Sequence, residues 1–119
     1  MDRALVTARA LTVHTVGRRT GRPHEVTVWF AHDDGALYFL AHARDHGRGT
    51  DWYRNLVAAG SAIVAVGDHR QRVVPGPFPI HVDDPIPYTV ALLEAKYGVG
   101  AVEDWYRPTR RIPVRVVPG

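Results

Sequence analysis

The sequence predicts a small, mainly β domain: an antiparallel β-barrel with flanking helices. Segments rich in β-branched and aromatic residues alternate with turns rich in glycine, proline and aspartate along the 119-residue chain, a spacing typical of antiparallel strands. One short helical segment falls between the third and fourth predicted strands, and the length suits a single domain over residues 1–119. Closing the sheet into a barrel would remove its exposed edges and leave a cleft at the rim.

The first half of the chain is predicted to form a three-stranded meander. We expect a short helix or loose arm at 1–9 and strands at 10–15, 25–32 and 36–41. The dipeptide Asp34-Gly35 favours a tight hairpin between the second and third strands.

The second half is predicted to combine two helices with further strands. Thr50 is a good N-cap, Trp52, Leu56 and Ala59 fall on one face of a helix, and Gly60 would end that helix. We also expect strands at 61–66 and 70–74, a helix at 88–97, a turn at 102–106 and a last strand at 112–117. A short strand can also form at 80–82.

The composition limits the chemistry that the chain can perform. It has no cysteine, which excludes disulfides, thiolate catalysis and zinc–thiolate sites, so any redox chemistry must come from a cofactor. The net charge of +3 rests almost wholly on arginine, with Lys96 as the only lysine, and arginine favours planar contacts to anions. The arginines are dispersed and no nucleic-acid-binding motif is present, so we expect no nucleic-acid partner.

We expect neither a metal site nor a membrane span. Asp33 and Asp34 lie where turns normally carry acidic residues, and the spacing of His42 and His46 has no third ligand from a familiar motif. No apolar run approaches the roughly 20 residues that a membrane-spanning helix needs. The start of the sequence lacks the apolar segment of a signal peptide, so we expect a cytoplasmic protein.

The loop between the first two strands concentrates polar groups. Two glycines and a proline shape this loop, and between and beside them lie Arg18, Arg19, Thr20 and Arg22. Guanidinium groups, a hydroxyl and backbone N–H groups together suit a phosphate or a carboxylate. Charged residues in a hairpin loop can also simply be solvated, and spacing alone leaves both interpretations open.

Three motifs resemble those of one enzyme family. Val-Gly-Arg-Arg-Thr-Gly-Arg-Pro at 16–23, Asp-Trp-Tyr-Arg-Asn-Leu at 51–56 and Thr-Arg-Arg-Ile-Pro-Val at 109–114 occur in the order typical of the deazaflavin-dependent nitroreductases. The resemblance implies a split β-barrel of the FMN-binding-like type that binds coenzyme F-420, with the phosphate and acidic tail of the coenzyme near the arginine loop.

The resemblance also implies which residues contact the cofactor. The phosphate-facing group would be Arg18, Arg19 and Thr20, and the strand along the deazaflavin would run from His24 to Trp29. The implied contacts beyond the loop are His24, Val26, Thr27, Val28, Trp29, Ala41, His42, Ala43, Arg44, Asp51, Trp52, Tyr53 and Asn55. The chain departs from the family at His24, Thr27 and His42, where arginine, proline and a small residue are usual.

The implied reaction is hydride transfer from C5 of the reduced deazaflavin to a small electron-poor acceptor such as a quinone or a nitro compound. Tyr97, Tyr106 and His42 are the candidate proton donors. Two alternatives stay open: a split barrel that binds FMN or haem, and a non-enzymatic binding module that has lost redox function. A homodimer is compatible with each of these.

Overall fold

The computed structural model describes residues 1–43, 50–103 and 111–119. Three helices occur in these ranges: α1 (Arg3–Thr7), α2 (Asp51–Ala59) and α3 (Pro85–Tyr97). The strands are β1 (Leu11–Val16), β2 (Pro23–Val28), β3 (Ala31–Asp33), β4 (Ala36–His42), β5 (Ala62–Val66), β6 (His69–Pro75) and β7 (Arg111–Pro118). The prediction of a mainly β domain with flanking helices is confirmed.

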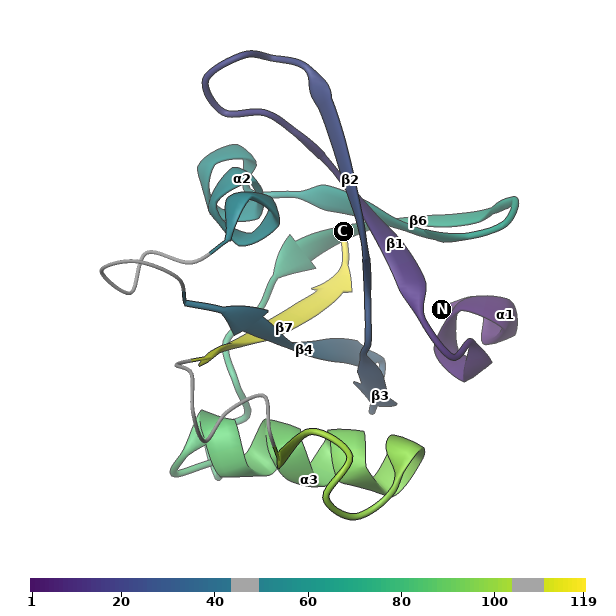
Figure 1. Ribbon diagram of the computed structural model, residues 1–119, viewed down its shortest axis with the longest axis vertical. Coiled ribbons are helices and arrows are strands. Elements are labelled where there is room, and N and C mark those ends of the chain that lie inside the picture. The colour runs from purple at the N-terminus through teal and green to yellow at the C-terminus, as the bar shows by residue number, and fades with distance from the viewer. Residues whose placement is uncertain (44–49, 104–110) are drawn as a thin grey trace.

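The strands form one curled, antiparallel sheet with the order β2-β1-β5-β6-β7-β4-β3. Figure 1 shows the curl, with α3 lying across one end of the molecule and the β1–β2 hairpin extending at the other. The expectation that closure removes the edges is wrong, because β2 and β3 are the two ends of the strand order. The barrel is therefore split between two strands that follow each other in the chain.

The predicted strand at 25–32 is in fact two strands. The chain leaves the sheet at Trp29 and Phe30 and re-enters it at the opposite edge as β3. The backbone N–H of Phe30 donates to the Tyr97 hydroxyl at 3.2 Å, so a side chain of α3 satisfies a group that a continuous strand would have paired. The apolar alternation continues through this point, which is why the pattern alone indicated a single strand.

The predicted hairpins and helix ends are mostly confirmed. Asp34 and Gly35 both have positive φ, 46° and 77°, as a tight Asp-Gly turn requires. Helix α2 ends at Gly60, with φ 74° and its N–H bonded to the Leu56 carbonyl oxygen at 2.8 Å. Thr50 precedes α2 as expected, but its side chain makes no capping hydrogen bond.

The segment before α3 differs from the prediction. Residues 80–82 form a turn instead of a strand, closed by the Val82 N–H on the Pro79 carbonyl oxygen at 2.9 Å. Prolines 75, 77 and 79 remove the backbone donors that a strand needs. Helix α3 begins at Pro85, earlier than expected, because a proline is tolerated in the first turn and the Asp84 carboxylate accepts from the Ile86 N–H at 3.2 Å.

Two apolar clusters lie on opposite faces of β4. The first fills the inside of the curled sheet and contains Phe39, Trp52 and Leu56. The second lies between α3 and the outer face of β3 and β4, and contains Leu40 and Leu93. Strand β4 is buried on both faces, and this explains its nearly continuous apolar sequence. No helix in the described parts of the chain is long and apolar enough to cross a membrane.

The inner face of α2 provides a test of this packing. Leu56 is 1% exposed and its neighbour Val57 is 57% exposed. We expect Leu56→Ala to lower the free energy of unfolding by about 2–5 kcal/mol, because it leaves a cavity in the first cluster. The control Val57→Ala should change it by less than about 0.5 kcal/mol. Urea unfolding of both variants measures the difference, and equal effects would contradict the orientation of α2.

Candidate functional site

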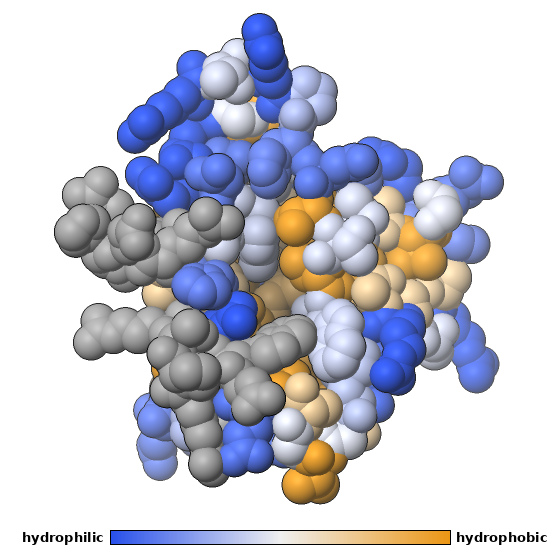
Figure 2. All heavy atoms as spheres, viewed as in Figure 1, coloured by the Kyte–Doolittle hydropathy of each residue, from blue (hydrophilic) through white to orange (hydrophobic). Residues whose placement is uncertain are grey.

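A groove of about 440 Å³ lies in the split of the barrel. Strand β4 pairs with β3 only from Ala36 to Tyr38, and the stretch beyond Tyr38 contributes to the groove opposite β2. The described lining residues are His24, Glu25, Val26, Thr27, Val28, Trp29, Phe39, Leu40, His42, Thr50, Asp51, Trp52 and Arg111. Figure 2 shows apolar residues exposed in the middle of the molecule, below the hydrophilic β1–β2 hairpin at the top of the view.

A second hollow, of about 270 Å³, lies between the β1–β2 loop and α2. It is lined by Gly17, Arg18, Arg19, Thr20, Arg22, Pro23, His24, Asp51 and Asn55. His24 and Asp51 line both the groove and this hollow. The two spaces therefore adjoin, one bordered by the arginine loop and the other by apolar and aromatic side chains.

Hydrogen bonds between backbone groups shape the β1–β2 loop. The Gly17 N–H donates to the Arg22 carbonyl oxygen and the Gly21 N–H donates to the Gly17 carbonyl oxygen, both at 2.8 Å. Gly21 has φ 69°, a conformation that favours glycine. The side chains of Arg19, Thr20 and Arg22 are exposed, so the loop presents two guanidinium groups and a hydroxyl to solvent.

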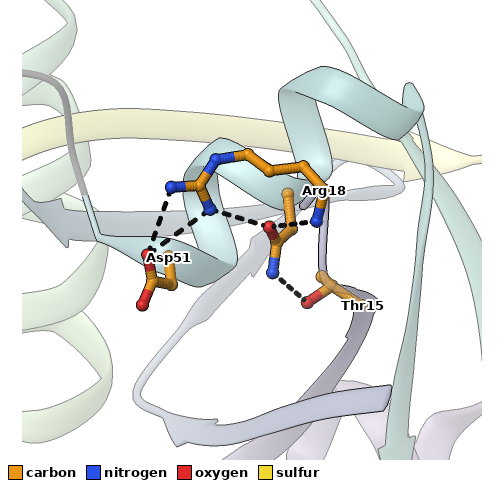
Figure 3. Close-up of polar contacts among 4 residues, drawn as sticks. Thr15, Arg18 and Asp51 are labelled. Atoms are coloured by element: carbon orange, nitrogen blue, oxygen red, sulfur yellow. Dashed lines mark hydrogen bonds and ion pairs between the residues drawn. The ribbon is translucent and has the colours of Figure 1, made fainter. Parts of the chain in front are cut away.

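Asn55 connects this loop to α2, beside the contact between Arg18 and Asp51 that Figure 3 shows. Its side-chain oxygen accepts from the Arg18 backbone N–H at 3.1 Å and from Arg18 Nη1 at 2.9 Å. Its amide nitrogen donates to the Thr15 hydroxyl at 3.2 Å. The Arg18 guanidinium also lies 3.4 Å from an Asp51 carboxylate oxygen. One buried amide thus joins strand β1, the loop and the helix.

Two residues that line the groove each have one buried polar atom without a hydrogen-bond partner among the described residues: Nδ1 of His24 and the hydroxyl oxygen of Thr50. Buried polar groups in native proteins are nearly always hydrogen-bonded. Their position suits a ligand that brings polar atoms into the groove.

The model of the family described as F420H(2)-dependent quinone reductase matches residues 2–118. The chain belongs to this family. It is therefore an oxidoreductase that depends on coenzyme F-420, as the three motifs predicted. No curated protein matches the chain.

Solved structures share the fold of this F-420-dependent oxidoreductase. An F420 reductase is 24% identical over 98% of this chain and 91% of its own, with a TM-score of 0.62. The F420-H2 dependent reductase FDR-A is 18% identical over 92% of this chain and 93% of its own, with a TM-score of 0.60. A domain-swapped dimer is 19% identical over 98% of this chain and 81% of its own, also with a TM-score of 0.60. The prediction of a split barrel is confirmed.

The residues of the groove and the hollow fit the coenzyme. A charged loop beside a groove with an apolar and aromatic lining matches a cofactor that has a phosphate and acidic tail attached to a planar ring. His24 and Thr50, whose buried Nδ1 and hydroxyl oxygen have no hydrogen-bond partner in the part of the chain that the structure describes, suit a ring system with polar edge groups.

The structure brings most of the predicted cofactor-binding residues of this oxidoreductase together. Those that line the groove or the hollow are Arg18, Arg19, Thr20, His24, Val26, Thr27, Val28, Trp29, His42, Asp51, Trp52 and Asn55. Ala41 and Ala43 are buried, Tyr53 packs edge-on against Trp52, and none of the three lines either space. Arg44 and Tyr106 lie outside the described residues.

Sequence reasoning missed several lining residues of the groove. Phe39 and Leu40 are predicted only as part of the strand at 36–41, and Thr50 only as a helix cap. Arg111 begins the last strand and lies in the third motif, at 109–114, but that motif indicated a closing strand and not a place in the groove. Glu25 lies inside the strand predicted to run along the cofactor, so its position in the sequence could have identified it as a lining residue. These residues meet in the groove only because β2, β4, β7 and α2 converge there.

Tyr97 lies behind the groove. Its ring stacks on Trp29 with centroids 4.1 Å apart, and Trp29 lines the groove. The Tyr97 hydroxyl donates to the Arg9 carbonyl oxygen at 2.6 Å and accepts from the Phe30 N–H. Burial raises the pKa of Tyr97, opposed by the Phe30 hydrogen bond and by Arg9. The Tyr97 hydroxyl therefore joins α3 to the backbone of Arg9 and of Phe30, where the chain leaves β2.

Lys96 lies beside the same aromatic cluster. Its ammonium nitrogen is buried without a hydrogen-bond partner in the described residues and lies 3.4 Å from the centroid of the Phe30 ring. Burial, together with the charge of Arg9, lowers the pKa of Lys96 to about 8. The protonated form of this lysine is thus less favoured in the folded state than in the unfolded chain, although the Phe30 ring faces it.

We expect Asn55→Ala to destabilise the protein by about 1–3 kcal/mol, because it leaves buried hydrogen-bonding groups of Arg18 and Thr15 unpaired. It should also speed amide hydrogen exchange at Gly17–Arg22 relative to β5 and β6. Hydrogen-exchange mass spectrometry measures both effects, with Val57→Ala as the control on the same helix. Unchanged exchange in the loop would show that Asn55 does not hold it.

Lys96 predicts a pH dependence of stability. Between about pH 8 and pH 10 the folded protein has lost this proton while the unfolded chain, with an ordinary lysine pKa, still binds it. Since the unfolded state binds more protons, the contribution of Lys96 to stability rises with pH across this window. Denaturant unfolding at several pH values should show that rise in the wild type relative to Lys96→Met. Parallel pH profiles of the two proteins would contradict it.

Proposed function

We propose that the protein binds coenzyme F-420 with its phosphate-bearing tail in the second hollow and its deazaflavin ring in the groove along β2. The observation that carries this proposal is the adjacency of the two spaces through His24 and Asp51. A single ligand with a planar part and an anionic part can occupy both at once. The family membership supports this assignment over the FMN and haem alternatives.

The arginines of the loop would then have different tasks. Arg18 is bonded to Asn55 and Asp51, so it holds the loop against α2. Arg19 and Arg22 are exposed and line the hollow, so they are the residues that bind the phosphate or the acidic tail. The Thr20 hydroxyl already accepts from the Arg22 N–H at 3.2 Å, and its proton can be donated to the same anion.

The groove would position the ring and exclude water. The Trp52 indole is largely buried against Phe39, with ring centroids 5.6 Å apart, and Trp29 is supported from behind by Tyr97. These rigid walls leave few orientations to a planar ligand. The two unpartnered atoms, His24 Nδ1 and the Thr50 hydroxyl oxygen, are the side-chain groups that we assign to polar atoms of the ring.

The proposed reaction reduces a small electron-poor acceptor such as a quinone or a nitro compound. The bound, reduced coenzyme supplies a hydride. Of the predicted proton donors, we assign the role to an imidazole nitrogen of His42, because His42 lines the groove. Tyr97 supports Trp29, and the role of Tyr106 stays a prediction.

We also propose a homodimer, which agrees with the similarity to a structure that is a domain-swapped dimer. A second copy would cover part of the split barrel. The cytoplasmic location, the single-domain organisation and the lack of a nucleic-acid partner stay predictions.

The arginine loop provides the test of cofactor binding. Titration with coenzyme F-420, followed by its fluorescence, should show saturable binding to the wild type. Arg19→Gln and Arg22→Gln should each weaken that binding about tenfold, as expected for the loss of one charge-assisted contact. Arg70→Gln, which changes an exposed arginine outside both spaces, should have no effect. Binding of FMN in place of coenzyme F-420, or equal binding by all variants, would contradict the proposal.

A further inference from the structure

Arg111 and His42 occupy adjacent positions on neighbouring strands beside the groove. They are opposite each other in the antiparallel register of β4 and β7, so their side chains leave the same face of the sheet from Cβ atoms about 5 Å apart. Both line the groove and neither lines the second hollow next to the arginine loop. The pair therefore lies in the part of the groove away from the second hollow, to which we assign the coenzyme tail.

Charge distinguishes Arg111 from the other described lining residues of the groove. Among them it is the one arginine or lysine. Burial lowers the pKa of its guanidinium, but arginine stays protonated in proteins. A permanent cation beside an imidazole N–H donor is an arrangement that stabilises a negatively charged oxygen.

We propose that Arg111 and His42 form an oxyanion subsite for the acceptor. This inference rests on the proposed function. Hydride addition forms a new C–H bond on a quinone-type acceptor and moves an electron pair of its carbonyl group onto the oxygen. The Arg111 guanidinium stabilises the resulting oxyanion. An N–H group of the His42 imidazole then gives its proton to that oxygen, which forms the O–H bond and leaves the imidazole with one proton fewer. The subsite therefore selects acceptors whose reduction places negative charge on oxygen.

The first experiment measures binding without turnover. Oxidised coenzyme F-420 is bound first, and the complex is titrated with a hydroxynaphthoquinone that is ionised at neutral pH, next to the neutral parent naphthoquinone. Arg111→Gln should weaken binding of the ionised compound about tenfold or more, the loss expected for one charged hydrogen bond. Binding of the neutral compound should change less than twofold, and Arg111→Lys should restore part of the loss. The matched control is Arg70→Gln.

The second experiment separates this inference from the proposed function. Coenzyme F-420 should bind the wild type and Arg111→Gln with equal affinity, while the rate of hydride transfer to the neutral naphthoquinone falls at least tenfold in the variant. If the wild type does not bind the coenzyme, the proposed function fails. If both proteins bind it but the ionised quinone shows no preference for the wild type, the subsite is wrong. If Arg111→Gln loses the coenzyme itself, Arg111 serves the cofactor and the acceptor assignment is overturned.

Discussion

The architecture depends on the point where the chain leaves β2. At Trp29 and Phe30 the backbone passes from one edge of the sheet to the other, and the Tyr97 hydroxyl accepts the Phe30 N–H at that place. If β2 had continued as one strand, the chain would not have crossed to the far edge of the sheet. No split would then separate β2 from β3. The groove lies in this split. The hydrogen bond between Phe30 and Tyr97 of α3 therefore helps to form the site, although Tyr97 lies behind the groove.

A second constraint is the burial of β4 on both faces. Phe39 packs inside the curled sheet and Leu40 packs against α3, so a one-residue shift of the strand's register would exchange the side chains that face the two clusters and disrupt the packing of both. Its pairing with β7 is therefore well determined, and this pairing sets His42 opposite Arg111. The same packing that stabilises the core thus aligns the two groups to which we assign the acceptor chemistry.

Much of the site could be predicted from three local motifs, because each is a short stretch with a role that its own residues define. The arginine loop is shaped by its glycines, and the face of α2 is set by helical periodicity. Thr50 and Leu40 could not be found in this way, since their place in the groove depends on which strands converge, and for Arg111 the third motif indicated a closing strand but not a place in the groove. The sequence alone allows Asn55 to bond either a loop backbone group or a cofactor group, and only the folded loop shows its side-chain oxygen accepting from the Arg18 N–H.

The sequence by itself determined the strand and helix types, the Asp34-Gly35 hairpin and the family of the protein, because these follow from short-range periodicity, turn chemistry and motif spacing. The tertiary structure alone decided that 25–32 is two strands, that Tyr97 supports Trp29 and that β2 and β3 are the strands on either side of the split. Each of these depends on contacts between residues far apart in the chain, such as Phe30 with Tyr97. No local pattern contains that information, because the free energy of such contacts is realised only when the elements pack together.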